Sequence, residues 1–149
     1  MKLAEALQER ADLNRRLEQL RHRLCNNAIV QEGEKPAEDP QKLLAEQEEC
    51  LNRMEMLMAQ INLTNSRTTA DGKTLTEWIA RRDALKLRIT ALQEMTDAAS
   101  RIAQRATRSE IKIFSTVEVP VLQSQLDAAC AELRKVDNMI QQANWLTEL

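Results

Sequence analysis

Residues 121–143 read VLQSQLDAACAELRKVDNMIQQA, and this stretch decides the fold class. Within it, apolar side chains recur at alternating steps of four and three residues, which is the spacing of a heptad repeat on one helical face. The repeat is carried by Leu122, Leu126, Ala129, Leu133, Val136, Ile140 and Ala143. The pattern predicts a long amphipathic helix over about residues 120–144.

Three earlier segments show the same one-sided apolar spacing, and they predict helices over about residues 2–28, 40–63 and 75–107. Asp39-Pro40 supplies an N-cap and the residue type favoured at the first helical position. After a turn at Asp71-Gly72, Thr74 and Glu77 have the spacing of a capping box.

Two segments between the helices carry other signals. Residues 62–66 (NLTNS) are rich in side chains that bond to the backbone, so we expect the second helix to end there in a turn, with a ligand pocket as the alternative. Residues 109–120 (SEIKIFSTVEVP) are β-prone and partly alternating. We expect an extended or kinked connector there, with a short strand as the alternative.

The composition excludes the β classes. The chain of 149 residues has 2 Gly, 3 Pro, 1 Phe, 2 Trp and no Tyr, whereas a sandwich or barrel needs many turns and strands rich in aromatic and β-branched residues. We therefore expect an all-α protein, with residues 1–149 forming a single domain. The simplest architecture is an elongated antiparallel bundle of four long helices.

Charge is balanced overall but segregated along the chain. The formal net charge is −2, which gives no global attraction to nucleic acid or to an anionic membrane. Residues 1–30, 31–60, 61–117 and 118–149 carry net charges of +2, −5, +4 and −3. This alternation favours pairing of neighbouring segments, within the fold or between subunits.

The cysteines and the hydropathy pattern predict a location. Cys25, Cys50 and Cys130 are odd in number and far apart, which indicates free thiols and a reducing compartment. Acidic and basic residues interrupt the first apolar positions, so we expect no signal peptide. No run approaches the roughly 18 apolar residues of a membrane span. The expected location is the cytoplasm.

One row of cations is a candidate binding site for an anion. Arg101, Arg105, Arg108 and Lys112 stand at i, i+4, i+7 and i+11, so on a continuous helix they point the same way. Such a row holds phosphates or a nucleic-acid backbone. We favour a structural ion-pair seam instead, because cations near a helix C-terminus are stabilised by the macrodipole. The absence of neighbouring aromatic residues also disfavours single-stranded nucleic acid.

Metal and nucleophilic chemistry find little support. One histidine cannot supply the two Glu-x-x-His motifs of a di-iron bundle. Carboxylates usually face solvent, and we expect the same of the glutamates that could otherwise form an all-carboxylate metal site. These are Glu5, Glu9, Glu46, Glu49, Glu94 and Glu110. His22 and Cys25 share a helix face, but two helical neighbours are by default no dyad. We expect no catalytic residues, no cofactor and no enzymatic activity, and the metal question stays open.

Polar residues interrupt the predicted apolar faces at Arg10, Asn14, Arg21, Gln47 and Arg82. Such positions cost stability, but they fix register and oligomeric state. Apolar residues near the C-terminus, Trp145 and Leu146, favour docking on another subunit. The three methionines at 54, 56 and 58 are expected to fill gaps in a core.

Several local strings resemble a known family. They are residues 30–40 (VQEGEKPAEDP), 62–66 (NLTNS), 108–112 (RSEIK) followed by 115–117 (STV), and 143–149 (ANWLTEL). In this order and spacing they resemble the septicolysin-like family of short bacterial helical proteins. The resemblance implies an all-helical, oligomeric protein without an established activity. The three cysteines depart from that family's pattern, and the densely charged helices do not suit the membrane damage that the name suggests.

The function that these observations predict is self-association. We expect a non-enzymatic cytoplasmic helical protein that forms a homo-oligomer, with itself as its partner. The first alternative is an anion- or nucleic-acid-binding module that uses the arginine row. The further alternatives are a membrane-active septicolysin-like protein and a metal-binding bundle.

Overall fold

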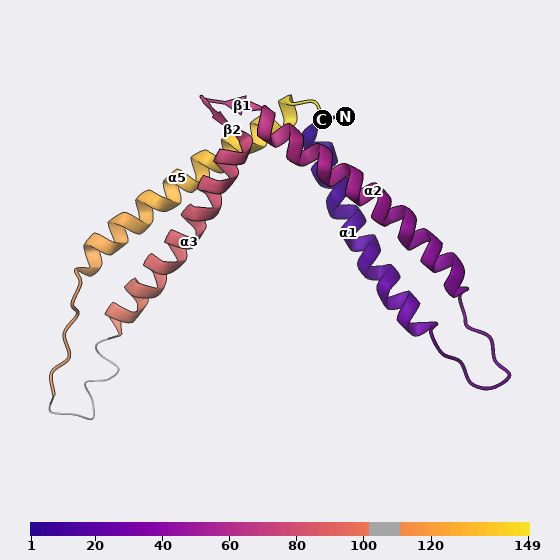
Figure 1. The fold of residues 1–149 in the computed structure, drawn as a ribbon. Coiled ribbons are helices and arrows are strands. Elements are labelled where there is room, and N and C mark those ends of the chain that lie inside the picture. The colour runs from indigo at the N-terminus through magenta and orange to yellow at the C-terminus, as the bar shows by residue number, and fades with distance from the viewer. Residues whose placement is uncertain (102–110) are drawn as a thin grey trace. The chain divides into compact units, whose positions relative to one another are not determined.

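The structure is a computed structural model that describes residues 1–101 and 111–149. Four long helices carry most of the described chain: α1 (Leu3–Asn26), α2 (Pro40–Arg67), α3 (Leu75–Ser100) and α5 (Val119–Leu146). Helices α1 and α2 run antiparallel, and so do α3 and α5 (Figure 1). The predicted all-α class with antiparallel helices is confirmed.

The chain divides into two compact units, which are described separately below. The first unit consists of residues 1–68 and 143–149, and the second of residues 69–142. The first therefore contains α1, α2 and the end of α5, while the second contains α3 and most of α5. The interpretation of residues 1–149 as a single domain stays a prediction.

The core of the first unit is aliphatic. Leu20 of α1 packs with Leu43 and Cys50 of α2, and half-buried leucines of α1 surround them. Further along the two helices, Leu3, Ala6, Leu57 and Ile61 are almost completely buried. These positions follow the three- and four-residue spacing seen in the sequence, because that spacing keeps them on the side where the helices meet.

The core of the second unit is centred on a tryptophan. Trp78 and Leu85 of α3 pack against Val136 and Ile140 of α5. The indole Nε1 of Trp78 donates a hydrogen bond to the Ala70 carbonyl oxygen at 2.7 Å, so this buried ring keeps its polar atom satisfied. It thereby fixes the segment before α3 to the helix.

That segment is a small hairpin, whereas the sequence predicted only its turn. Strands β1 (Thr69–Ala70) and β2 (Lys73–Thr74) pair antiparallel in the register Thr69↔Thr74 and Ala70↔Lys73. Asp71 and Gly72 form the predicted turn with φ of +49° and +77°, and positive φ at both central residues is typical of tight hairpin turns. The Asp-Gly pair was the available signal.

The predicted helix starts are confirmed. Helix α2 begins at Pro40, and the Asp39 side chain accepts a hydrogen bond from the Gln41 N–H at 3.0 Å. At α3, the Thr74 hydroxyl oxygen accepts from the Glu77 N–H at 3.2 Å, and the Glu77 carboxylate accepts from the Thr74 N–H at 2.7 Å. These reciprocal bonds lower the pKa of Glu77.

The predicted turn at residues 62–66 is wrong, since α2 continues to Arg67. The polar side chains that suggested a turn bond within the helix instead: the Ser66 hydroxyl donates to the Leu63 carbonyl oxygen at 2.8 Å. The helix then ends where the hairpin begins, and the Thr68 N–H donates to the Thr64 carbonyl oxygen at 2.9 Å. Hydrogen bonds from such side chains to the backbone are compatible with a turn and with a continued helix.

The predicted connector is confirmed over its described part. Residues 111–118 hold neither a helix nor a strand, and α5 begins at Val119. Helix α3 starts at Leu75 as predicted and is described to Ser100, with Arg101 as its C-cap. The predicted continuation over residues 102–107 lies outside the described residues.

Candidate functional site

The pair formed by α1 and α2 has one edge that is closed by ion pairs. Arg53 donates to Glu9 at 2.6 and 2.8 Å, and Arg16 donates to Glu46 at 2.7 Å. These bonds lower the pKa of Glu9 and raise the pKa values of both arginines. The two contacts join antiparallel helices, so position 9 lies near the height of position 53, and position 16 near that of position 46.

A third pair holds the loop end of the same edge. Arg23 of α1 donates to Glu38 at 3.1 Å and lowers the pKa of that carboxyl. Beside it the buried Asn27 caps α1: its side-chain N–H donates to the Arg23 carbonyl oxygen, and its oxygen accepts from the Glu38 N–H, both at 2.9 Å. The loop between the helices is thus fixed at both of its ends.

The opposite edge of α2 is apolar and uncovered. Leu44, Leu51 and Met58 stand at heptad spacing and are 46%, 44% and 46% exposed. Each directly follows a buried residue of the core stripe, namely Leu43, Cys50 and Leu57. Helix α2 therefore carries an apolar arc that is wider than α1 covers. We call Leu44, Leu51 and Met58 the α2 stripe.

The neighbouring edge of α1 carries polar residues that the sequence singled out. Arg10 interrupts the apolar stripe of α1 and is half-buried, while Asn14 and Arg21 are exposed. Arg21 pairs with Glu18 of its own helix. On α2, Gln47 lies half-buried between the core and the α2 stripe. None of these four residues is completely buried.

Two carboxylates line the outer side of the α2 stripe. Glu48 and Glu55 follow Leu44 and Leu51 by four residues and therefore lie beside them on the helix surface. Both are exposed. The open face of the first unit thus combines an apolar stripe and an acidic rim on α2.

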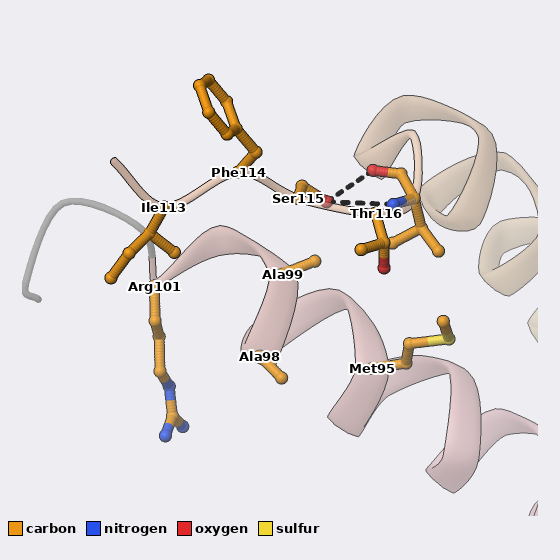
Figure 2. A pocket seen from close by; sticks show the side chains of 9 residues that line it. Met95, Ala98, Ala99, Arg101, Ile113, Phe114, Ser115 and Thr116 are labelled. Carbon is orange, nitrogen blue, oxygen red and sulfur yellow. Dashed lines mark hydrogen bonds between the residues drawn. The ribbon is translucent and has the colours of Figure 1, made fainter. Parts of the chain in front are cut away.

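Two members of the predicted arginine row, Arg105 and Arg108, lie outside the described residues. Arg101 caps α3, and Lys112 is exposed in the connector. Arg101 lines a shallow cavity of about 380 Å³ between the end of α3 and residues 113–117. Figure 2 shows this cavity: small and apolar side chains line it, and the Ser115 hydroxyl is already bonded to the backbone of Val117.

Within residues 1–101 and 111–149, no group of three or more His, Cys, Asp or Glu residues has metal-binding geometry. Glu9 and Glu46 of the candidate carboxylates are held by arginines, and Glu110 lies outside the described residues. His22 is 3.3 Å from Glu18, and Cys25 is exposed. Arg82, the remaining polar interruption, is half-buried and bonds to Asp83 at 3.0 Å.

The chain ends meet in the first unit, an arrangement for which the sequence held no signal. The Leu3 N–H donates to the Thr147 carbonyl oxygen, and the Leu149 N–H to that of Met1, both at 2.9 Å. Lys2 pairs with Glu148 at 2.6 Å and lowers its pKa. Trp145 and Leu146 remain 64% and 69% exposed beside this junction, and their docking on another subunit stays a prediction.

No described helix is both long enough and apolar enough to cross a membrane. The expectation that the chain lacks a membrane span is confirmed for residues 1–101 and 111–149.

Comparisons with known proteins assign a family. A solved structure, reported as a functionally unknown conserved protein from Corynebacterium diphtheriae, is 40% identical to this chain, with a TM-score of 0.95. The match covers 100% of this chain and 98% of that one. No functionally curated protein is similar.

The model of a family of unknown function, DUF6847, matches residues 10–149. That range contains all the strings on which the septicolysin-like resemblance rested, and the comparisons do not support that resemblance. The chain belongs to the DUF6847 family of unknown function.

Proposed function

We propose that this protein is a non-enzymatic, self-associating helical protein that buries the α2 stripe against another copy of itself. The observation that carries the proposal is the exposure of Leu44, Leu51 and Met58 at heptad spacing directly beside a buried stripe. Heptad spacing of exposed apolar residues is typical of a helix that packs against a further helix.

Burial of the α2 stripe would stabilise an association of two copies by several kcal/mol. Complete burial of a Leu or Met side chain contributes about 1.5–3 kcal/mol. Each of the three side chains is already about half covered, so covering the stripes of two copies contributes roughly 4.5–9 kcal/mol before the entropic cost of association. In an isolated pair, each helix is covered by a neighbour on one side only. In a four-helix bundle, each helix packs against neighbours around a shared core.

The test is sedimentation velocity on the whole chain at micromolar concentration. We expect a species of at least twice 17.0 kDa, and we expect Leu51→Glu to shift the population towards the single chain. The matched control is Leu87→Glu, because Leu87 of α3 is 75% exposed yet stands outside any heptad stripe. A single-chain species for the unmodified protein at every concentration contradicts the proposal.

Native mass spectrometry before and after addition of a chelator tests the non-enzymatic part of the proposal. We expect the mass of the oligomer to be unchanged by the chelator. A stoichiometric metal or a retained anion would contradict this part and would direct attention to the carboxylates or to the arginine row.

A further inference from the structure

The two ends of the sequence lie side by side in the first unit, where each caps a helix of the other (Figure 1). Leu3 is the first residue of α1, and its N–H is one of the donors that an α-helix leaves unpaired at its start. It donates to the Thr147 carbonyl oxygen, just after α5, at 2.9 Å. In return, the Lys2 Nζ donates to the carbonyl oxygen of Leu146, the last residue of α5, at 3.3 Å. Each end thus satisfies a polar group that the other helix leaves unpaired.

Charges close the same contact. The last turn of α5 contains no basic residue, although a cation near a helix C-terminus is favourable. Lys2 supplies this cation from the other end of the sequence, and its Nζ lies 2.6 Å from one carboxylate oxygen of Glu148. The Met1 ammonium lies 3.2 Å from the other oxygen. The Leu149 N–H donates to the Met1 carbonyl oxygen at 2.9 Å, so the two segments run antiparallel to each other.

We call residues 143–149 the strap. They belong to the first unit, whereas the preceding residues of α5 belong to the second. The strap itself is accessible: the side chain of Glu148 is 63% exposed and Trp145 is 64% exposed. Leu3, to which the strap bonds, is completely buried. A short segment that is held by a few hydrogen bonds and an exposed ion pair is typical of the parts of a protein that open most readily.

We infer that the strap opens and closes on the start of α1 while both helix pairs stay folded, and that the Lys2–Glu148 ion pair favours the closed state. The chain passes from one unit to the other at residues 68–69 and again at 142–143. Opening therefore removes the attachment that the second passage makes to the first unit. The α2 stripe contributes no residue to the strap, so this equilibrium is independent of self-association.

Amide hydrogen exchange, followed by NMR on the whole chain, measures this opening directly. The amides of Leu3 and Leu149 donate across the contact between the strap and α1, so they exchange whenever the strap is open. The amide of Leu57 lies in α2 at a completely buried residue and is the internal reference for unfolding of the helix pair. We expect Leu3 and Leu149 to exchange faster than Leu57, because opening of the strap leaves α1 and α2 folded.

Two variants test the role of the ion pair. Lys2→Met removes the cation but keeps the aliphatic part of the side chain, and Glu148→Gln removes the carboxylate charge. We expect each to raise the exchange rate at Leu3 about two- to fivefold, the range of an exposed ion pair, and to leave the rate at Leu57 unchanged. The double variant should raise the rate at Leu3 by less than the product of the two single effects, because the two side chains act on each other.

Lys42→Met is the matched control for Lys2→Met. Lys42 is exposed on α2 and has no ion pair within residues 1–101 and 111–149. The substitution changes the net charge by the same amount, and we expect it to leave the rates at Leu3, Leu149 and Leu57 unchanged.

Faster exchange at Leu3 and Leu149 than at Leu57, with single effects that are not multiplicative, supports the opening strap. Equal rates at all three amides would show that the strap opens only when the first unit unfolds, and this would overturn the inference. A rate at Leu3 that Lys2→Met leaves unchanged, or raises no more than Lys42→Met does, would overturn the role of the ion pair. So would a double variant whose effect equals the product of the single effects.

Discussion

The two helix pairs obtain their specificity in different ways. Two arginine–carboxylate pairs join α1 to α2 along one edge, a third joins α1 to the loop before α2, and an aliphatic core lies beside them. Between α3 and α5, a buried tryptophan anchors the core, and among described residues one ion pair, Arg81–Glu132, links the two helices. The first pair thus adds cross-helix ion pairs to an aliphatic core, whereas the second packs around one large buried side chain.

The two pairs also differ in what they leave uncovered. Helix α2 exposes a heptad stripe beside an acidic rim, while the most exposed leucine of α3, Leu87, stands outside any such stripe. An isolated exposed leucine is normal on a protein surface, but a continuous stripe indicates a partner. The first unit is therefore where we expect association to occur.

The largest effect should come from the anchor of the second unit. Trp78→Ala removes a ring that is 9% exposed and its bond to Ala70, and it should lower the free energy of unfolding by about 3–5 kcal/mol in urea denaturation. Trp145→Ala, at a ring that is 64% exposed, should cost far less.

Trp78→Phe keeps most of the ring but loses the Nε1 donor, so it should cost about 1 kcal/mol more than the loss of volume alone explains. Equal costs for Trp78→Ala and Trp145→Ala would contradict the assignment of Trp78 as the anchor.

In the first unit, two leucines of the same helix should separate folding from association. Leu57→Ala creates a cavity at a completely buried position and should lower the free energy of unfolding by about 2–5 kcal/mol. Leu51→Ala, in the α2 stripe, should leave the fold nearly as stable and weaken association. Urea denaturation combined with sedimentation distinguishes the two, and a reversed ranking would contradict the assignment of core and stripe.

A smaller effect should appear in the pH dependence of stability. The pKa of Glu9 is lowered by its bonds to Arg53, and that of Glu38 by Arg23. A lowered folded-state pKa stabilises the fold at pH above the ordinary value of 4.5, and this stabilisation is lost as the pH falls through the lower, folded value. Glu9→Gln should therefore flatten the acid side of the melting-temperature profile.

Glu94→Gln on α3 is the control for that measurement, because Glu94 has no ion pair in the part of the chain that the structure describes. An acid limb that changes equally in both variants would show that the edge of α1 and α2 is not stabilised by its charges.

The smallest effect concerns the hairpin turn. Gly72 has a φ of +77° and open space around an added Cβ, so Gly72→Ala should cost about 1 kcal/mol through backbone strain alone. Gly33→Ala, with a φ of +83° in the α1–α2 loop, is the matched variant in the first unit. Thermal unfolding compares the two, and a stabilised Gly72→Ala protein would contradict the strained conformation.

The sequence predicted those features that depend on neighbours along one helix. Apolar spacing identified the helices, and Asp39 and Thr74 marked the starts of α2 and α3, because these signals act over three or four residues. The end of α2 was misjudged, since the side-chain bond of Ser66 fits a helix as well as a turn. The hairpin was missed although its Asp71-Gly72 turn was recognised.

The candidate site depends on which helix lies against which, and the sequence holds that information only in part. Arg10 and Gln47 were recognised as interruptions of apolar faces, but their partial burial follows from the pairing of α1 with α2. The three methionines of α2 were expected to fill gaps in the core, but only Met54 is buried, while Met56 and Met58 are 56% and 46% exposed. The apolar arc of α2 is continuous, and only the partner helix divides it into buried and open parts. The junction of the chain ends required the fold as a whole.

Met56 and Met58 allow the most direct test of the central claim. They stand two residues apart on α2 and are 56% and 46% exposed, but only Met58 belongs to the α2 stripe. Oxidation by dilute peroxide, followed by mass spectrometry of peptides, measures the rate at each. If copies associate through the α2 stripe, Met58 oxidises more slowly than Met56 at high protein concentration, and the two rates converge on dilution. Similar rates at every concentration would contradict the account.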